Sequence, residues 1–190
     1  MEIAEPNVAT AAPQKQRTAT PRDDSKGVGT TQYLTFNAAG STYAMGIVSI
    51  KEIIEFGSIT TIPLMPSFIR GVINLRGSVV PVIDLAARLG FPTACPSRRT
   101  CIVIVEMHHH DEIFDMGVIV DGVSEVLELS GKDLEPPPTF GANIRNDFIA
   151  AMARIKNQFV IVMQLDQVLS IEEVSHLARI GSSPADERAE

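Results

Sequence analysis

Residues 68–85 decide the fold, and they read Phe68-Ile69-Arg70-Gly71-Val72-Ile73-Asn74-Leu75-Arg76-Gly77-Ser78-Val79-Val80-Pro81-Val82-Ile83-Asp84-Leu85. Gly71–Leu75 and Ser78–Ile83 consist mainly of aliphatic residues, many of them β-branched, which is typical of strands. Arg76 and Gly77 connect the two segments, and glycine readily adopts the positive φ that a two-residue hairpin turn requires. Pro81 has no N–H to donate, so we expect it at a sheet edge or a bulge. The stretch therefore predicts a β-hairpin.

Strand patterns continue on both sides of this hairpin. Cys101–Val105 is a continuous apolar run, which predicts a strand that is buried on both faces, and Val123–Leu129 alternates between apolar and polar residues. The other predicted strands are Tyr33–Phe36, Tyr43–Met45, Glu52–Phe56, Ile59–Ile62, Met116–Val120, Phe148–Ile155 and Phe159–Leu165. About ten short strands, with turn signals roughly every eight to twelve residues, indicate an all-β barrel or sandwich.

Helical segments are few and short in this prediction. One lies near Val48–Lys51. A second, Leu85–Leu89, follows Asp84, whose side chain suits the N-cap position, and it ends at Gly90. A third begins at Asp166–Leu169 and closes the fold.

Composition sets the bounds of the folded part. The 190 residues suit one domain, and an aromatic content of only 5% with no tryptophan predicts a mainly aliphatic core. Residues 1–30 are rich in Ala, Thr, Pro, Gln and Lys without periodicity, and residues 181–190 are similar, so we expect both to be flexible tails. Residues 31–180 then form the folded domain.

Charge and the overall sequence pattern disfavour several classes of protein. The net charge of −7 gives no advantage on a phosphate backbone, so we expect no nucleic-acid binding. There is no signal-peptide pattern and no apolar run of about 20 residues, which predicts a cytoplasmic protein without direct membrane insertion. The two cysteines, Cys95 and Cys101, do not have a common zinc-site spacing, and we interpret them as reduced thiols without a cofactor.

The sequence lacks the common enzyme motifs, although it holds one cluster of possible metal ligands. The G-x-S-x-G, P-loop, H-E-x-x-H and EF-hand patterns do not occur, which favours a non-enzymatic protein. His108-His109-His110 with Asp111 and Glu112 offers ligands for Zn, Ni or Cu. Adjacent side chains of a strand point to opposite faces, however, so we interpret this cluster as a solvated hairpin tip. A metal-binding protein remains an alternative that metal titration would test.

Three segments together resemble the CheW family. Residues 68–85 resemble its F-I-x-G-V-x-N-L-R-G-x-x-x-P-x-x-D-L core, and Gly117–Leu127 resembles its G-x-x-V-D-x-V-x-x-V stretch. Tyr43–Ile47, followed by Ile50–Ile53, resembles the pattern Y-x-x-x-I…V-x-E-I. The resemblance extends from about Tyr33 to Leu177, and it implies two five-stranded SH3-like β-barrels packed side by side and intertwined in one domain.

The resemblance also implies a function. CheW-type proteins are non-enzymatic scaffolds that bridge the cytoplasmic tip of a methyl-accepting chemoreceptor and the regulatory domain of the histidine kinase CheA. The chain would then be recruited to a membrane-associated array of a chemotaxis two-component system. Two alternatives are an adaptor of another chemosensory pathway, such as one controlling pili or biofilm, and a β-barrel nucleic-acid binder. The second needs a basic groove with stacking aromatic residues.

Nine positions match family sites for partner binding. Arg76 is implied near the receptor-facing surface and Glu52 in docking, although each is also explained as an ordinary solvated turn or strand residue. Gly71 and Gly117 match positions where a side chain would disturb an interface or a strand. The apolar positions line the kinase contact or the groove between the barrels, unless they are plain core, and they are Ile47, Ile50, Val79, Val123 and Val126.

Overall fold

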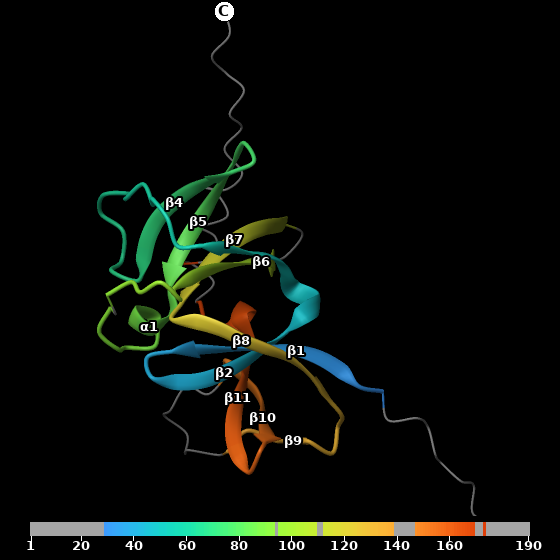
Figure 1. Ribbon diagram of the computed structural model, residues 1–190. Coiled ribbons are helices and arrows are strands. Elements are labelled where there is room, and N and C mark those ends of the chain that lie inside the picture. The colour runs from blue at the N-terminus through green and yellow to red at the C-terminus, as the bar shows by residue number, and fades with distance from the viewer. Residues whose placement is uncertain (1–28, 94, 110–111, 139–146, 170–172, 174–190) are drawn as a thin grey trace, which may run out of the picture.

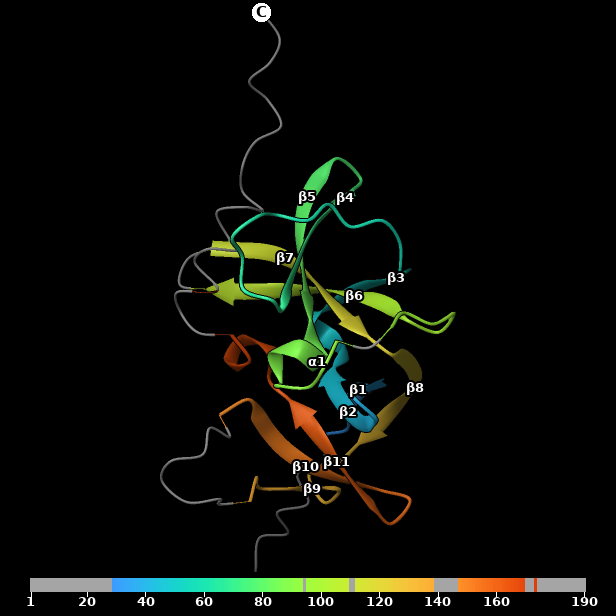
Figure 2. The same ribbon diagram turned by 90° about the vertical axis from the view of Figure 1, so that its left-hand side faces the viewer.

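The computed structural model describes residues 29–93, 95–109, 112–138, 147–169 and 173, and it forms two β-sheets (Figures 1 and 2). In sheet order, the six-stranded sheet contains β8 (Gly122–Leu129), β1 (Thr31–Ala38), β2 (Ser41–Gly46), β11 (Gln158–Met163), β10 (Ile149–Ile155) and β9 (Leu134–Glu135). The five-stranded sheet contains β3 (Ile50–Glu55), β6 (Cys101–His109), β7 (Glu112–Val120), β5 (Ser78–Asp84) and β4 (Ile69–Leu75). The predicted all-β class is confirmed, but one of the two sheets has six strands where the resemblance implied five. The expected tails, apart from Gly29 and Thr30, lie outside the described residues.

The chain passes from the six-stranded sheet to the other and back. β1 and β2 belong to the six-stranded sheet, the next five strands build the five-stranded sheet, and β8 returns to pair with β1. In Figure 1 the five-stranded sheet forms the upper body and the six-stranded sheet the lower one. The first and last parts of the described domain therefore share one sheet.

Three apolar cores account for this arrangement. The largest lies between the sheets, because it combines side chains of β1 and β2, such as Phe36 and Met45, with side chains of β6 and β7, such as Val103 and Met116. A second core belongs to the five-stranded sheet alone and a third to the six-stranded sheet alone. Each sheet therefore bends around its own core, and the shared core joins them. As the composition predicts, the cores are mainly aliphatic.

The hairpin of β4 and β5 forms as its sequence predicts. Leu75 pairs with Ser78, and the two turn residues have positive φ, 55° for Arg76 and 95° for Gly77, as a two-residue turn of this hand requires. Pro81 pairs with Val72, whose N–H and carbonyl both bond to Thr60 at 2.9 Å instead of to β5. Pairing of β5 with β7 starts only at the next residue, so the missing N–H of Pro81 leaves no ladder bond unmade.

The predicted helices are confirmed in place but are shorter. In α1 (Leu85–Arg88) the Asp84 carboxylate accepts the Ala87 N–H at 3.0 Å, which is the predicted cap. The first helix is the 3₁₀ turn η1 (Ile47–Ser49), and Lys51 already belongs to β3. The closing helix begins as η2 (Leu165–Gln167), and most of the chain after it lies outside the described residues.

One predicted strand is reduced to a single bridge. Ile59–Ile62 contributes only the pairing of Thr60 with Val72. Pro63 follows at once, and because proline cannot donate to a ladder the pairing does not extend.

Candidate docking surface

The nine predicted site residues fall into three places. The two glycines are buried inside the five-stranded sheet. Arg76 and Glu52 form an ion pair at one end of this sheet, beside a cleft that Val79 lines. The remaining four residues lie on η1, β3 and β8.

Packing within the sheet explains the two glycines. Gly71 has a φ of 136°, and a Cβ there would lie 2.0 Å from the Thr60 carbonyl oxygen. A Cβ on Gly117 would lie 2.8 Å from Ile102 Cγ2 and 3.1 Å from Val82 Cγ2. The 2.0 Å and 2.8 Å distances are too short for a real contact, so strand packing alone is a sufficient reason for glycine at these positions.

The Arg76–Glu52 pair presents a guanidinium to solvent. Arg76 Nη2 donates to Glu52 Oε2 at 2.9 Å, and the Arg76 side chain is 79% exposed while that of Glu52 is 25% exposed. The pair connects the β4–β5 turn to β3, two elements at opposite edges of the sheet order. Exposed pairs contribute only about 0.2–1 kcal/mol to stability. The guanidinium fork, held in place by Glu52, is suited to a carboxylate or to carbonyl oxygens of a partner.

A second charged cluster, which the sequence did not single out, lies on β3, β6 and β7. Lys51 Nζ lies 2.6 Å from Asp115 Oδ1 and 3.0 Å from Glu106 Oε2. Asp115 and then Glu106, as hydrogen-bond acceptors, raise the pKa of Lys51, and the hydrogen bond from Lys51 lowers the pKa of Glu106. Only the pairing of β6 with β7 places Glu106 opposite Asp115, so no local pattern could have predicted the cluster.

A cleft adjoins this charged cluster. It is lined by half-buried Val79 and by exposed Ile113, together with Lys51, Ser78, Val80, Phe114 and Asp115. Val79 is therefore a residue of a surface cleft and is not part of the closed interior.

The apolar residues gather where the outer strands of the two sheets approach each other. We define the apolar seam as Ile47, Ile50, Ile53, Val123 and Val126. Ile53, Val123 and Val126 are 41%, 38% and 46% exposed, whereas Ile47 and Ile50 are half-buried. These fractions exclude a plain core role for the two valines. Ile53 was not predicted as a site residue. Its position next to the predicted Glu52 is the signal that could have identified it.

Cys101 marks the point where the two edges of the seam meet. The Val123 N–H bonds to the Cys101 thiol, whose pKa burial raises. Cys101 pairs with Glu55 on β3, and Ile53 pairs with the neighbouring Val103 on the same face. The start of β8 and the end of β3 are therefore neighbours, and η1, at the other end of β3, lies against β1.

The histidine hairpin and the described helices bear on metal binding and on membrane insertion. His108 lies 3.4 Å from Glu106 on β6, and β6 pairs with β7 as expected, while residues 110–111 of the predicted cluster lie outside the described residues. Among the described residues, no three His, Cys, Asp or Glu side chains are close enough to hold a metal ion. None of the described helices is long and apolar enough to cross a membrane.

The comparisons with known proteins agree with this architecture. The CheW-like domain family matches residues 32–173, and the chain belongs to this family. The chemotaxis protein CheW of Rhizobium meliloti (strain 1021) is 30% identical over 145 residues, which cover 76% of this chain and 91% of the relative. CheW of Klebsiella aerogenes is 28% identical over 152 residues, covering 80% and 89%. The crystal structure of the scaffolding protein TtCheW from Thermoanaerobacter tengcongensis superimposes with a TM-score of 0.67 at 33% identity, covering 76% of this chain and 97% of that one.

Proposed function

We propose that this chain is a chemotaxis adaptor that binds the cytoplasmic tip of a chemoreceptor and the regulatory domain of a CheA-type kinase, and that it transforms no substrate. One observation carries the proposal most directly. Three aliphatic side chains of the seam, Ile53, Val123 and Val126, are about two-fifths exposed. By contrast, the β-branched residues of β6 and β7 are buried, apart from Ile113. Exposed apolar surface of this kind marks interaction sites.

The shape of the seam suits a helical partner. It follows the outer strands of two sheets, and an amphipathic helix binds such a surface with residues spaced three or four apart. Burial of the exposed parts of the valines and Ile53 would supply the favourable free energy of binding. A chemoreceptor held in a membrane would then keep this chain at the membrane through protein contacts alone.

Arg76 supplies a polar contact in this proposal. Its guanidinium lies at the tip of the β4–β5 turn and is mainly open to solvent, so a partner carboxylate or a helix C-terminus could approach it. Glu52 orients the guanidinium through their 2.9 Å ion pair. The pair contributes little to folding, which makes binding the better physical reason for its geometry.

Signal transfer would need no chemistry in the adaptor. The core shared by the two sheets joins them into one unit, so a partner on one side alters the position of a partner on the other. The size of the effect is limited by the difference in affinity for the two signalling states of each partner.

Separate pull-downs test the proposal. Val126→Asp and Arg76→Ala are compared with the wild type for retention of a receptor cytoplasmic fragment and of the CheA regulatory domain, each alone and both from the organism that encodes this chain. The matched control is Phe91→Asp, because Phe91 is also 46% exposed but lies beyond α1. We expect Val126→Asp to lose at least one partner and Phe91→Asp to keep both. Unchanged binding of both partners by the folded Val126→Asp and Arg76→Ala variants would contradict the proposal.

A further inference from the structure

A β-bulge gives the seam its two valines. Leu34 of β1 pairs with Val126, and Phe36 pairs with Val123, so β1 advances by two residues while β8 advances by three. Direct cross-strand partners point to the same face of a sheet. Val123 and Val126 therefore point to the face of Leu34 and Phe36, although in a regular strand two residues three apart point to opposite faces.

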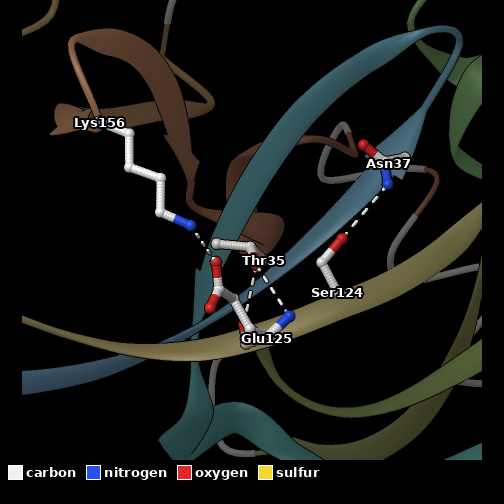
Figure 3. Close-up of polar contacts among 5 residues, drawn as sticks. All are labelled: Thr35, Asn37, Ser124, Glu125 and Lys156. Atoms are coloured by element: carbon white, nitrogen blue, oxygen red, sulfur yellow. Dashed lines mark hydrogen bonds and ion pairs between the residues drawn. The ribbon is translucent and has the colours of Figure 1, made fainter.

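The side chain of Thr35 closes this bulge (Figure 3). Its hydroxyl donates to the Glu125 carbonyl at 2.8 Å and accepts the Glu125 N–H at 3.1 Å. Thr35 is only 4% exposed, and a buried hydroxyl without partners is unfavourable. Both hydrogen-bonding functions of the hydroxyl are met by one residue of the bulge, so the bulged register is the one that satisfies it.

Two further contacts hold the same segment from its sides. Asn37 Nδ2 donates to Ser124 Oγ at 3.3 Å, and Lys156 Nζ lies 3.4 Å from Glu125 Oε1 (Figure 3). Lys156 comes from the turn between β10 and β11. These two contacts are exposed, and so they are weaker than the buried Thr35 contacts.

The bulge decides which residue faces the seam. If β8 kept the pairing of Leu34 with Val126 and continued without a bulge, Phe36 would pair with Ser124 and Val123 would turn to the opposite face. The seam would then present one valine and one serine. Bulges commonly re-aim a side chain in this way.

We propose that Thr35 is a positioning residue for partner docking, which fixes the bulged register of β8 and thereby keeps Val123 and Val126 together on the seam. This inference rests on the proposed docking function. Thr35 itself contacts no partner in this proposal, because it is only 4% exposed.

The test compares substitutions at this position. Thr35→Val keeps the branched shape but removes both hydrogen bonds, whereas Thr35→Ser keeps the hydroxyl. Val160→Ala is the control. It removes buried apolar volume from the third core, which belongs to the six-stranded sheet alone, and Val160 is not a residue of the bulge. The first readout is the amide hydrogen exchange of Glu125, and the second is the affinity for the receptor fragment and the CheA regulatory domain, measured separately.

We expect Thr35→Val to speed the amide hydrogen exchange of Glu125 and to weaken, about tenfold, binding of the partner that Val126→Asp loses. Thr35→Ser should be close to the wild type, and Val160→Ala should be unchanged in both readouts. Equal weakening by Val160→Ala would overturn the inference, because a general loss of stability would then suffice. Wild-type affinity of Thr35→Val would also overturn it. If Val126→Asp still loses its partner in that case, the docking proposal stands, and if Val126→Asp binds normally, the docking proposal fails as well.

Discussion

Lys51 Nζ and Asp115 Oδ1 lie 2.6 Å apart although their strands, β3 and β7, are separated by β6. Lys51 also reaches Glu106 on the intervening strand, so one ammonium joins three strands. β3 is an outer strand of its sheet and carries Ile50 and Ile53 of the seam. The cluster therefore holds an edge strand that the proposed function uses.

The cluster makes stability depend on pH on the acid side. Lys51 holds the pKa of Glu106 below its ordinary value of 4.5, so the ionised carboxylate stabilises the fold above that value, and the contribution is lost as the pH falls through the lowered pKa. We expect Glu106→Gln to lower the melting temperature slightly at pH 7 and to have a smaller effect at pH 3, where more of the carboxylate is protonated. Thermal unfolding of both proteins across this range measures it.

Salt provides the control for this prediction. Because Glu106 is on the surface, 1 M NaCl screens the pair and should shrink the difference at pH 7. A difference that is as large at pH 3 as at pH 7, or that grows with salt, would contradict an ionic origin.

The glycines of the five-stranded sheet allow a graded test of packing. We expect Gly71→Ala to lower the free energy of unfolding by more than about 3 kcal/mol, because the new Cβ meets a rigid carbonyl and the φ is positive. Gly117→Ala meets flexible side chains and should cost about 1–3 kcal/mol. Urea unfolding followed by circular dichroism measures both.

Gly131→Ala is the matched control for these two variants. A Cβ at Gly131 has nothing within 4 Å, so this variant should unfold like the wild type. If Gly117→Ala proves as stable as Gly131→Ala yet fails to bind a partner, an interface role would explain that glycine better than strand packing.

Local patterns carried most of the fold prediction. The Arg76-Gly77 turn, the Asp84 cap and the buried run at Cys101–Val105 depend on neighbouring residues, and each is present. The predicted strand at Ile59–Ile62 is reduced to one bridge, because only Thr60 finds backbone hydrogen-bond partners, on Val72, and Pro63 follows. Short apolar runs do not state how much of them finds a partner strand.

The candidate site was harder to predict for the same reason. Val123 and Val126 sit in an alternating segment, and strict alternation would place them on opposite faces. The Thr35 hydroxyl, on a strand distant in sequence, bonds to Glu125 in the bulge that places the two valines on the same face. Likewise, the Lys51 cluster exists only through the pairing of β3, β6 and β7. Family resemblance identified the valines, but only the three-dimensional register explains why they are exposed together.

Asp84 joins two elements through one buried carboxylate. One oxygen caps α1 at Ala87, and the other lies 3.3 Å from Arg70 Nη1. We expect Asp84→Ala to cost about 2–3 kcal/mol, because it removes the cap and the charged contact at a site only 4% exposed. Asp84→Asn keeps a capping oxygen and should cost less. Chemical unfolding of the three proteins gives the order.

An exposed aspartate serves as the comparison for Asp84. Asp166 lies in the first turn of η2 and is exposed, so Asp166→Ala should change stability by less than about 0.5 kcal/mol. Equal losses for Asp84→Ala and Asp84→Asn would mean that the Arg70 contact, not the cap, carries the effect.

Arg76 should separate binding from stability. We expect Arg76→Ala to change the free energy of unfolding by less than about 1 kcal/mol, because its side chain is 79% exposed and its ion pair with Glu52 lies at the surface. Partner affinity should fall about tenfold or more, because a guanidinium that meets a carboxylate or carbonyls at an interface loses charge-assisted hydrogen bonds. Arg76→Lys should recover little of this loss, since an ammonium lacks the planar fork.

A double-mutant cycle with Glu52→Gln, measured by calorimetry against each partner, then distinguishes the two roles of the pair. If Glu52 only orients Arg76, the Glu52 substitution weakens binding in the wild type but has no effect once Arg76 is alanine. Additive losses would instead mean that Glu52 contacts a partner by itself, and wild-type affinity of Arg76→Ala for both partners would remove Arg76 from the docking surface.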